Sequence, residues 1–326
     1  MDIQPSLTIG VLTSGGDAPG MNACVRAIVR TGMANNVRVL GVYNGYQGLI
    51  DGEYRPLNAR DVGGILQRGG TILQTRRSMR FMEKSGQRDA IRKMNEAGMD
   101  ALIVIGGDGS LHGAQVLQQE GIRVVGIPAS IDNDIWGTNM AIGVDTAMNT
   151  IMDAVDKLRD TASSHSRAFL VETMGRNCGY LAVMAGIVCG AEMVLIPEVH
   201  TSVEEVAKAI ENAYTRGKNH SIIIVAEGSG YRATDLASSL EAMDVGFHTR
   251  VTVLGHIQRG GSPTAYDRLI ASRMGFRAVE ALLQGQTGVM TGLKGSGIEL
   301  VPIADVIANK RAVNMEYIQM AKVLAS

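Results

Sequence analysis

Three apolar runs, at residues 7–12, 101–105 and 124–127, each end in a loop that combines small residues with aspartate. The loops read T-S-G-G-D, G-G-D-G-S and I-D-N-D. Runs of this kind predict buried strands, and a helical pattern follows the first two loops. Strands that alternate with helices form a parallel sheet, which gathers such loops at its carboxyl edge, where ligands bind. The repetition therefore predicts an α/β fold with a phosphate-binding edge.

The alternation continues along the chain as a coarse repetition of βαβ units in two halves. A chain of 326 residues is long enough for two domains. The glycine-rich stretch 287–296 reads as a surface turn. We expect further strands at 37–42, 168–172, 193–196, 221–226 and around 250, and helices at 89–96, 112–119, 144–160, 181–188, 203–214, 267–284 and 314–324.

Composition argues against several classes of function. The net charge is −1, which provides no basic field for nucleic acid or an anionic membrane, and aromatic residues make up only 4%. The start, M-D-I-Q-P-S, lacks the features of a signal peptide, and the apolar segment 181–197 is too short to span a bilayer. The cysteines, Cys24, Cys178 and Cys189, have no C-x-x-C spacing and read as buried thiols in a reducing compartment. We expect a cytoplasmic protein.

The third loop carries two carboxylates, Asp132 and Asp134, separated only by Asn133. Such carboxylates can face one cavity, one towards a proton and one towards a metal, although a solvated Asx turn would have the same sequence. Arginines follow a Gly-Gly turn at Arg76, Arg77 and Arg80 and suit either a phosphate clamp or a solvated charge run.

Together these elements match the needs of phosphoryl transfer, which are positioning, charge neutralisation and a base. The glycine loops can hold a polyphosphate, Asp108 or Asp134 can hold Mg²⁺, and Asp132 can take the proton. The sequence lacks a G-x-x-x-x-G-K-[ST] P-loop, a G-x-S-x-G elbow, a His/Cys cluster and a Rossmann fingerprint. Hydrolase and dehydrogenase functions are thus disfavoured.

The chain resembles the ATP-dependent 6-phosphofructokinases of the bacterial type over almost its whole length. The resemblance is carried, in order, by T-S-G-G-D-A-P-G-M-N, R-G-G-T, G-G-D-G-S, I-D-N-D, M-G-R-x-C-G and G-H-I-Q-R-G-G-S-P. It implies two similar αβα sandwich domains with mostly parallel sheets. An ATP-binding domain would comprise residues 1–143 plus 258–305, and a fructose 6-phosphate-binding domain residues 144–257 plus 306–326.

The resemblance also implies the glycolytic transfer of a phosphoryl group from MgATP to the 1-hydroxyl of fructose 6-phosphate. Asp132 would be the base and Arg176 would lie near the transferred group. The implied ATP site comprises Gly16, Arg77, Ser78, Gly107, Asp108, Gly109 and Ser110, with Asp108 on Mg²⁺. The implied sugar-phosphate site comprises Ser130, Ile131, Asp132, Met174, Gly175, Arg176, Glu227, His256, Ile257, Gln258 and Arg259, with Arg167 and Arg250 from a neighbouring subunit.

The family resemblance further implies a homotetramer with shared active sites and an allosteric site for ADP or phosphoenolpyruvate. Ala59 and Asn219 stand where the family commonly has Arg and Lys, so we expect weakened control. The implied effector residues are Arg26, Arg30, Arg159, Glu192, Arg216, Lys218 and His220.

Two positions bear on the phosphoryl donor. Pyrophosphate-dependent relatives have Asp in place of Gly109 and Lys in place of Ala129, so this chain favours ATP, although Ala129 is itself unusual. A non-catalytic regulatory subunit is a third alternative. It would predict loss of Asp132, Asp134 or Arg176, and all three are present.

Overall fold

The computed structural model describes residues 7–325, and these residues form two compact units. Unit 1 contains the chain up to Ser130, together with Ile135–Asp145 and Arg259–Arg311. Unit 2 contains Ile131–Asp134, Thr146–Gln258 and the chain from Ala312. The chain therefore passes between the units several times. The segment of the third loop that carries Asp132 and Asp134 groups with unit 2.

Unit 1 is built on a seven-stranded sheet with the order β11-β10-β5-β4-β1-β2-β3. The inner strands run parallel, and the edge strands β3 and β11 are antiparallel to their neighbours. Every residue of β1 and β4 is buried, as expected for parallel strands covered on both faces. The strands are β1 (Leu7–Ser14), β2 (Val37–Val42), β3 (Tyr54–Pro56), β4 (Ala101–Gly106), β5 (Arg123–Pro128), β10 (Val289–Lys294) and β11 (Gly297–Pro302).

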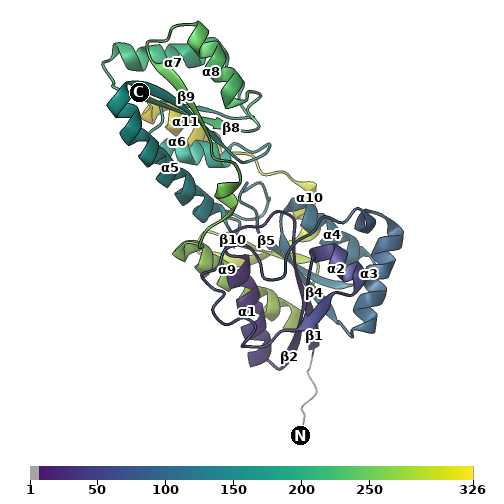
Figure 1. Cartoon of the computed structure of the whole chain (residues 1–326). Coiled ribbons are helices and arrows are strands. Elements are labelled where there is room, and N and C mark those ends of the chain that lie inside the picture. The colour runs from purple at the N-terminus through teal and green to yellow at the C-terminus, as the bar shows by residue number, and fades with distance from the viewer. Residues whose placement is uncertain (1–6, 326) are drawn as a thin grey trace. The chain divides into compact units, whose positions relative to one another are not determined.

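Helices cover both faces of this sheet (Figure 1). On one face α1 (Met21–Ala34) packs along α9 (Ala265–Leu283). The other face carries α2 (Gly45–Asp51), α3 (Lys84–Glu96), α4 (Asp108–Gln119) and α10 (Ile303–Ala308), with a 3₁₀ turn η1 (Arg80–Met82) beside α3. The strand order places β1, β4 and β5 side by side, so the three loops predicted from the sequence do follow neighbouring strands.

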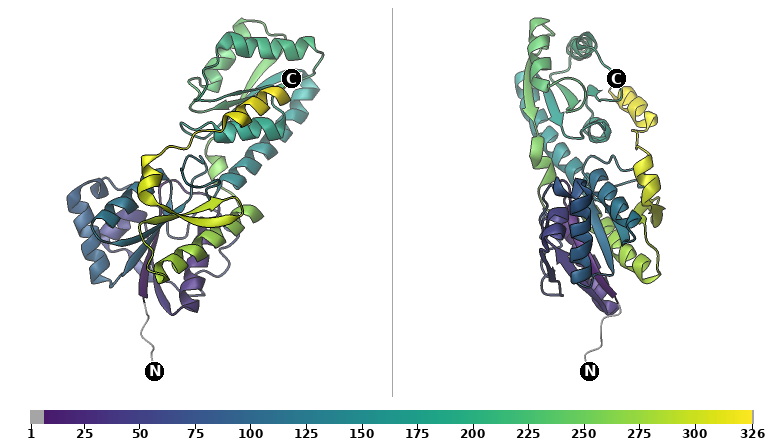
Figure 2. Two further views of the ribbon diagram at one scale, coloured as in Figure 1. Left: turned by 180° about the vertical axis from the view of Figure 1, so that it is seen from behind. Right: turned by 90° about the vertical axis from the view of Figure 1, so that its right-hand side faces the viewer.

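Unit 2 has a four-stranded parallel sheet with the order β7-β8-β6-β9. One face is covered by α6 and α11, which pack together (Figure 2), and the other by α7 and α8. The elements are α5 (Val144–His165), β6 (Arg167–Thr173), α6 (Tyr180–Cys189), β7 (Met193–Leu195), α7 (Val203–Thr215), β8 (Ser221–Ala226), α8 (Ala233–Ala242), β9 (His248–Val253), the 3₁₀ turn η2 (Gly255–Arg259) and α11 (Met315–Leu324).

The predicted α/β class with mostly parallel sheets is confirmed, and one prediction is wrong. Residues 287–296 are not a surface turn, because β10 lies within them, between β5 and β11, and is largely buried. Helix α4 begins at Asp108 and not at the predicted position 112. All three cysteines are buried. Within residues 7–325, no helix is long and apolar enough to cross a membrane.

Candidate active site

An irregular segment, residues 68–78, lies against the first glycine loop of unit 1, residues 13–17. Asn22, at the start of α1, donates to the carbonyls of Arg68 and Gly69 and accepts from the backbone N–H of Ile72 at 2.7 Å. The hydroxyl of Thr75 donates to the carbonyl of Gly15 at 2.7 Å. Buried, fully bonded Asn22 thus fixes a segment that has no secondary structure of its own.

This anchored segment carries the predicted nucleotide residues Arg77 and Ser78. The Arg77 side chain is exposed, whereas the Ser78 hydroxyl donates to Gln47 and accepts from the backbone of Phe81. Arg80 behaves differently from the predicted clamp, because its guanidinium pairs with two carboxylates, Asp51 at 3.2 Å and Asp89 at 3.1 Å. The guanidinium of Arg77 is therefore better placed than that of Arg80 to meet a phosphate.

The second glycine loop, Gly106–Ser110, forms the N-terminus of α4, where backbone N–H groups and the helix dipole favour anions. Tyr46 supports it from α2, since its hydroxyl donates to the carbonyl of Ser110 at 2.6 Å and its ring stacks on Phe81 at 4.1 Å. Tyr46 is buried, which raises the pKa of its phenol. Neither the support from Tyr46 nor the anchoring role of Asn22 was predicted from the sequence. Of these two residues, only Asn22 belongs to one of the motifs that carry the family resemblance.

Asp108 lies in the first turn of α4 with its side chain 56% exposed. One turn along the helix, Nδ1 of His112 lies 3.6 Å from Oδ1 of this carboxylate. Within the described part of the chain, no three His, Cys, Asp or Glu side chains are grouped closely enough to hold a metal ion. A single exposed carboxylate at a helix N-terminus could hold Mg²⁺ that arrives with nucleotide phosphates, because Mg²⁺ takes few protein ligands and keeps phosphates and waters.

The third loop follows β5 and adjoins the second. The backbone N–H of Ala129 donates to the carbonyl of Gly106 at 2.9 Å. A Cβ on Gly107 would lie 3.8 Å from Cβ of Ser130, so the two turns are in contact. Further along, Asp132 is 2% exposed and Asn133 is fully buried with a φ of 52°. The burial favours a specific role for Asp132 over a solvated Asx turn.

In unit 2, Arg176 lies directly against this aspartate. Its Nε is 3.3 Å from Oδ2 of Asp132, while the Arg176 side chain remains 58% exposed. The backbone that presents it is unusual, with φ of 142° at Gly175 and 51° at Arg176. Glu227 stabilises this shape, since its Oε1 accepts from the N–H of Gly175 at 3.2 Å and of Arg176 at 2.7 Å. In such an ion pair, the buried carboxylate can accept a proton from a reacting hydroxyl, and the accessible guanidinium can stabilise an anion during its transfer.

The turn that follows β9 contains four more predicted substrate residues. His256 and Ile257 are exposed, whereas Gln258 is fully buried and bonds to backbone groups. Arg259 lies over the first glycine loop of unit 1, where its Nη1 donates to the carbonyl of Asp17 at 3.4 Å.

Two predicted arginines of unit 2, Arg167 and Arg250, lie on one face of the sheet. Arg167 begins β6, and Arg250 pairs in register with Phe169 on the next strand. The Met174–Arg176 loop follows the opposite end of β6, which has 7 residues. The strand thus separates Arg167 from this loop by about 20 Å. Arg250, opposite Phe169, lies about four residues from the end of the strand that this loop follows, so the backbones of both arginines are separated from Arg176 within one chain.

The predicted effector residues fall into two groups, one in each unit. In unit 2, Glu192 accepts from the N–H of Ile222 at 2.6 Å and pairs with Lys218 at 3.2 Å, and Arg159 donates to the carbonyl of Cys189. Burial lowers the pKa of the nearby His220, an effect opposed by Glu192 and reinforced by Arg159 and Lys218. Arg216, at the end of α7, donates to its own helix at the carbonyl of Asn212.

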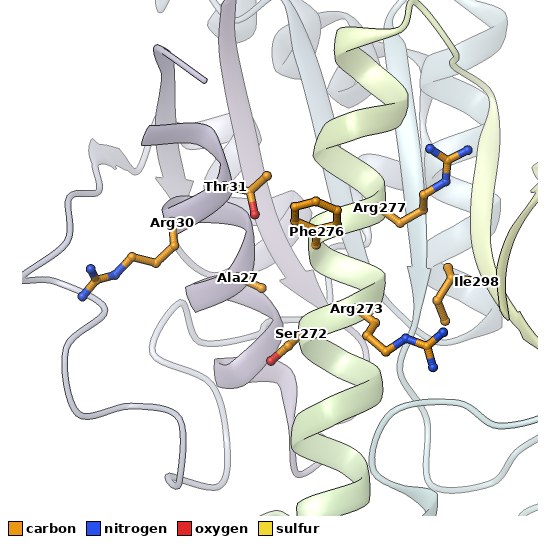
Figure 3. Close-up of a pocket in the computed structure, with 8 residues that line it drawn as sticks. All are labelled: Ala27, Arg30, Thr31, Ser272, Arg273, Phe276, Arg277 and Ile298. Carbon is orange, nitrogen blue, oxygen red and sulfur yellow. The ribbon is translucent and has the colours of Figure 1, made fainter. Parts of the chain in front are cut away.

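In unit 1 the other two effector residues, Arg26 and Arg30, lie on α1, and Arg30 lines a hollow of about 460 Å³ between α1 and α9. Figure 3 shows Arg30 directed away from α9, while Arg273 and Arg277 extend on the other side of that helix. Arg30 donates to the carbonyl of Ala59 at 3.4 Å. The guanidinium groups around this hollow diverge and do not form an anion clamp there.

Comparisons with known proteins agree with this geometry. Residues 8–282 match the family model described as Phosphofructokinase. A protein of Thermotoga neapolitana named ATP-dependent 6-phosphofructokinase is 52% identical over 318 residues, covering 97% of this chain and 99% of the relative. ATP-dependent 6-phosphofructokinase 1 of Thermus thermophilus is 49% identical over 320 residues, with 97% and 99% covered. The structure of phosphofructokinase from Saccharomyces cerevisiae superposes with a TM-score of 0.89 at 37% identity, covering 98% of this chain and 48% of the yeast chain.

Proposed function

The chain belongs to the phosphofructokinase family, and we propose that it transfers the γ-phosphoryl group of ATP to the 1-hydroxyl of fructose 6-phosphate. The products are fructose 1,6-bisphosphate and ADP, and the reaction is a step of glycolysis. The observation that carries the proposal is the ion pair between buried Asp132 and exposed Arg176, in a chain half identical to proteins named for this activity. We expect the enzyme to act in the cytoplasm, where its buried cysteines would stay reduced.

Asp132 is the proposed general base. Its carboxylate would accept the proton of the 1-hydroxyl as the oxygen attacks the γ-phosphorus, and a buried position keeps water away from this proton transfer. Arg176 would hold the carboxylate in place and meet the negative charge of the transferred group with its remaining N–H donors.

On the nucleotide side, the proposed ligands are Gly16, Arg77, Ser78 and the loop Gly107–Ser110. Backbone N–H groups of the glycine loop and the start of α4 would receive the phosphates. Asp108 would hold Mg²⁺, which when bound neutralises phosphate charge during transfer.

Two observations support ATP as the donor over pyrophosphate. A Cβ added at Gly109 would meet no atom within 4 Å, so the space beside the phosphate loop is open for the rest of a nucleotide. Ala129 is 1% exposed, and its burial leaves no solvated position for the lysine of the pyrophosphate-dependent relatives.

The proposed sugar-phosphate ligands are Ser130–Asp132, Met174–Arg176, Glu227, His256, Ile257 and Arg259, while the buried Gln258 bonds only to backbone groups. Arg167 and Arg250 would complete the site from a neighbouring subunit, and their distance from Arg176 along β6 supports this arrangement. We therefore expect a homotetramer with shared active sites. ADP or phosphoenolpyruvate would act at the effector residues, with weak control because of Ala59 and Asn219.

The test is the formation of fructose 1,6-bisphosphate from fructose 6-phosphate and Mg²⁺, with ATP or pyrophosphate as the only donor. The proposal expects turnover with ATP and little with pyrophosphate. Turnover with pyrophosphate alone would overturn the donor assignment. A well-folded wild-type protein that is inactive with both donors would instead favour the regulatory subunit.

A further inference from the structure

We propose that the Gln258 side chain is a positioning residue for Arg176 and does not contact the substrate. The inference rests on the proposed function, in which Arg176 acts on the transferred group. Gln258 lies in the turn η2 with 0% exposure, although glutamine is usually a surface residue. Both ends of its amide are bonded to backbone, because Oε1 accepts from the N–H of Met174 at 3.2 Å and Nε2 donates to the carbonyl of Gly255 at 2.9 Å.

The hydrogen bond between Met174 and Gln258 lies in the loop that presents Arg176, where it can restrain the backbone. Three consecutive N–H groups, of Met174, Gly175 and Arg176, all donate to side chains: the first to Gln258 and the other two to Glu227. The loop has positive φ at Gly175 and Arg176, a shape that persists only where the surroundings impose it. Gln258 and Glu227 supply that restraint from two different elements, η2 and the end of β8.

Glutamine suits this position chemically. The N–H of Met174 requires an acceptor and the carbonyl of Gly255 requires a donor, and a neutral amide supplies both without burying a charge. A methionine of the same length supplies neither bond. An ionised glutamate keeps the acceptor but turns an oxygen towards the carbonyl of Gly255, whereas a protonated glutamate restores both bonds.

Loss of the restraint acts on the reaction through the guanidinium of Arg176, which lies 3.3 Å from Asp132. A displacement of about 1 Å at such a group costs on the order of 100-fold in rate. We expect Gln258→Met to lower kcat about 10-fold to 100-fold, with the KM for fructose 6-phosphate changed by less than about threefold. Gln284→Met, at an exposed glutamine of unit 1, serves as the matched control with wild-type kinetics.

Gln258→Glu provides the rescue. Burial favours the neutral form of a carboxyl group, so the ratio of its kcat to that of the wild type should rise as the pH is lowered from 8 to 6. The same ratio for Gln258→Met should stay level. A double-mutant cycle with Arg176→Ala completes the kinetic test, since Gln258→Met should lower kcat little further once the guanidinium is gone.

Hydrogen exchange of the peptide that covers residues 173–178 gives a readout independent of activity. Exchange of this peptide should accelerate in Gln258→Met more than exchange in the rest of unit 2, and it should remain at the wild-type rate in Gln284→Met. A raised KM with unchanged kcat, or equal losses with and without Arg176, would overturn the proposal. If the wild type shows no turnover, the proposed function fails, and unchanged exchange in Gln258→Met would separately refute the positioning role.

Discussion

Gly16 lies directly beneath the guanidinium of Arg259, so that a Cβ at position 16 would sit 2.3 Å from Nη1. Two residues far apart in the sequence, from the first glycine loop and from the turn after β9, thus share one small space. Any side chain at position 16 would have to displace this guanidinium, so the contact ties the proposed nucleotide loop to a residue predicted to bind sugar phosphate.

Gly16→Ala should displace the Arg259 guanidinium and narrow the space above the loop. We expect kcat/KM for ATP to fall at least about tenfold, as for a small group that intrudes on a preorganised site. In the Arg259→Ala background the same change should cost much less, because the clashing group is absent. Steady-state kinetics of the two single variants and the double variant measure this; additive losses would show that the clash is not the cause.

Asp132→Ser should lower kcat by about 100-fold to 10,000-fold, the range expected when a general base is removed. The KM for fructose 6-phosphate should change little, because the carboxylate acts mainly on the proton in transit. Asp132→Asn, which keeps the shape of the side chain, should lose a similar factor. Near-normal kcat in either variant would refute the assignment of the base.

Gly109→Asp should impair the use of ATP far more than Gly109→Ala. The methyl group of alanine meets no atom within 4 Å, whereas a carboxylate at the start of α4 would repel the nucleotide phosphates. We expect kcat/KM for ATP to fall more than tenfold for the aspartate variant and less than about threefold for the alanine variant. Equal effects of the two changes would mean that this position does not face the phosphates.

Asn22→Ala should raise the KM for ATP several-fold without abolishing turnover. The change removes three hydrogen bonds to residues 68–72, which hold the segment that presents Arg77. Because it leaves buried backbone groups unbonded, it should also lower the free energy of unfolding by about 1–3 kcal/mol. Kinetics and urea unfolding check the two effects, and Asn35→Ala, at the C-cap of the same helix, is the control for stability alone.

His220 should make effector binding pH-dependent. Burial lowers its pKa below the ordinary value of 6.5, so the imidazole is mostly neutral at pH 7 and gains its charge as the pH falls further. The affinity for ADP should therefore rise in the wild type relative to His220→Gln as the pH falls below 6.5, and the two should agree at pH 7.5. Calorimetric titration at several pH values measures the difference.

Ala59 and Asn219 should keep ADP activation weak, because the family commonly has Arg and Lys at these positions. A steep sigmoidal substrate curve that ADP makes hyperbolic would contradict that expectation.

Much of the fold could be read from the sequence because buried parallel strands are continuous apolar runs. The strands at 37–42 and 221–226 are confirmed with the predicted bounds. Strand β10 was not predicted because the glycine-rich sequence of residues 287–296 is typical of a turn. Gly292 is needed for a different reason, since a Cβ there would lie 2.2 Å from the carbonyl oxygen of Gly137 on the adjoining segment. Close approach of two backbones leaves no periodicity that a sequence could reveal.

The candidate site was predictable where chemistry sets the residue type and less so where tertiary contacts do. Asp132 and Arg176 were predicted and lie together. The support of the second glycine loop by Tyr46 depends on a hydrogen bond across 64 positions in the chain, and an isolated tyrosine carries no sign of such a partner. The remaining assignments of substrate contacts stay predictions.

Because unit 1 is built from separate stretches of the chain, the course of the chain also constrains how this unit folds during synthesis on the ribosome. Strand β5 ends at Pro128, but its neighbour β10 begins only at Val289. At a synthesis rate of about 5–20 residues per second, one edge of the nascent sheet lacks its permanent neighbour for on the order of ten seconds. An uncovered apolar strand edge invites association with other chains. Unit 1 therefore cannot mature before most of the polypeptide has emerged, and chaperone protection should matter most while residues 129–289 are being translated.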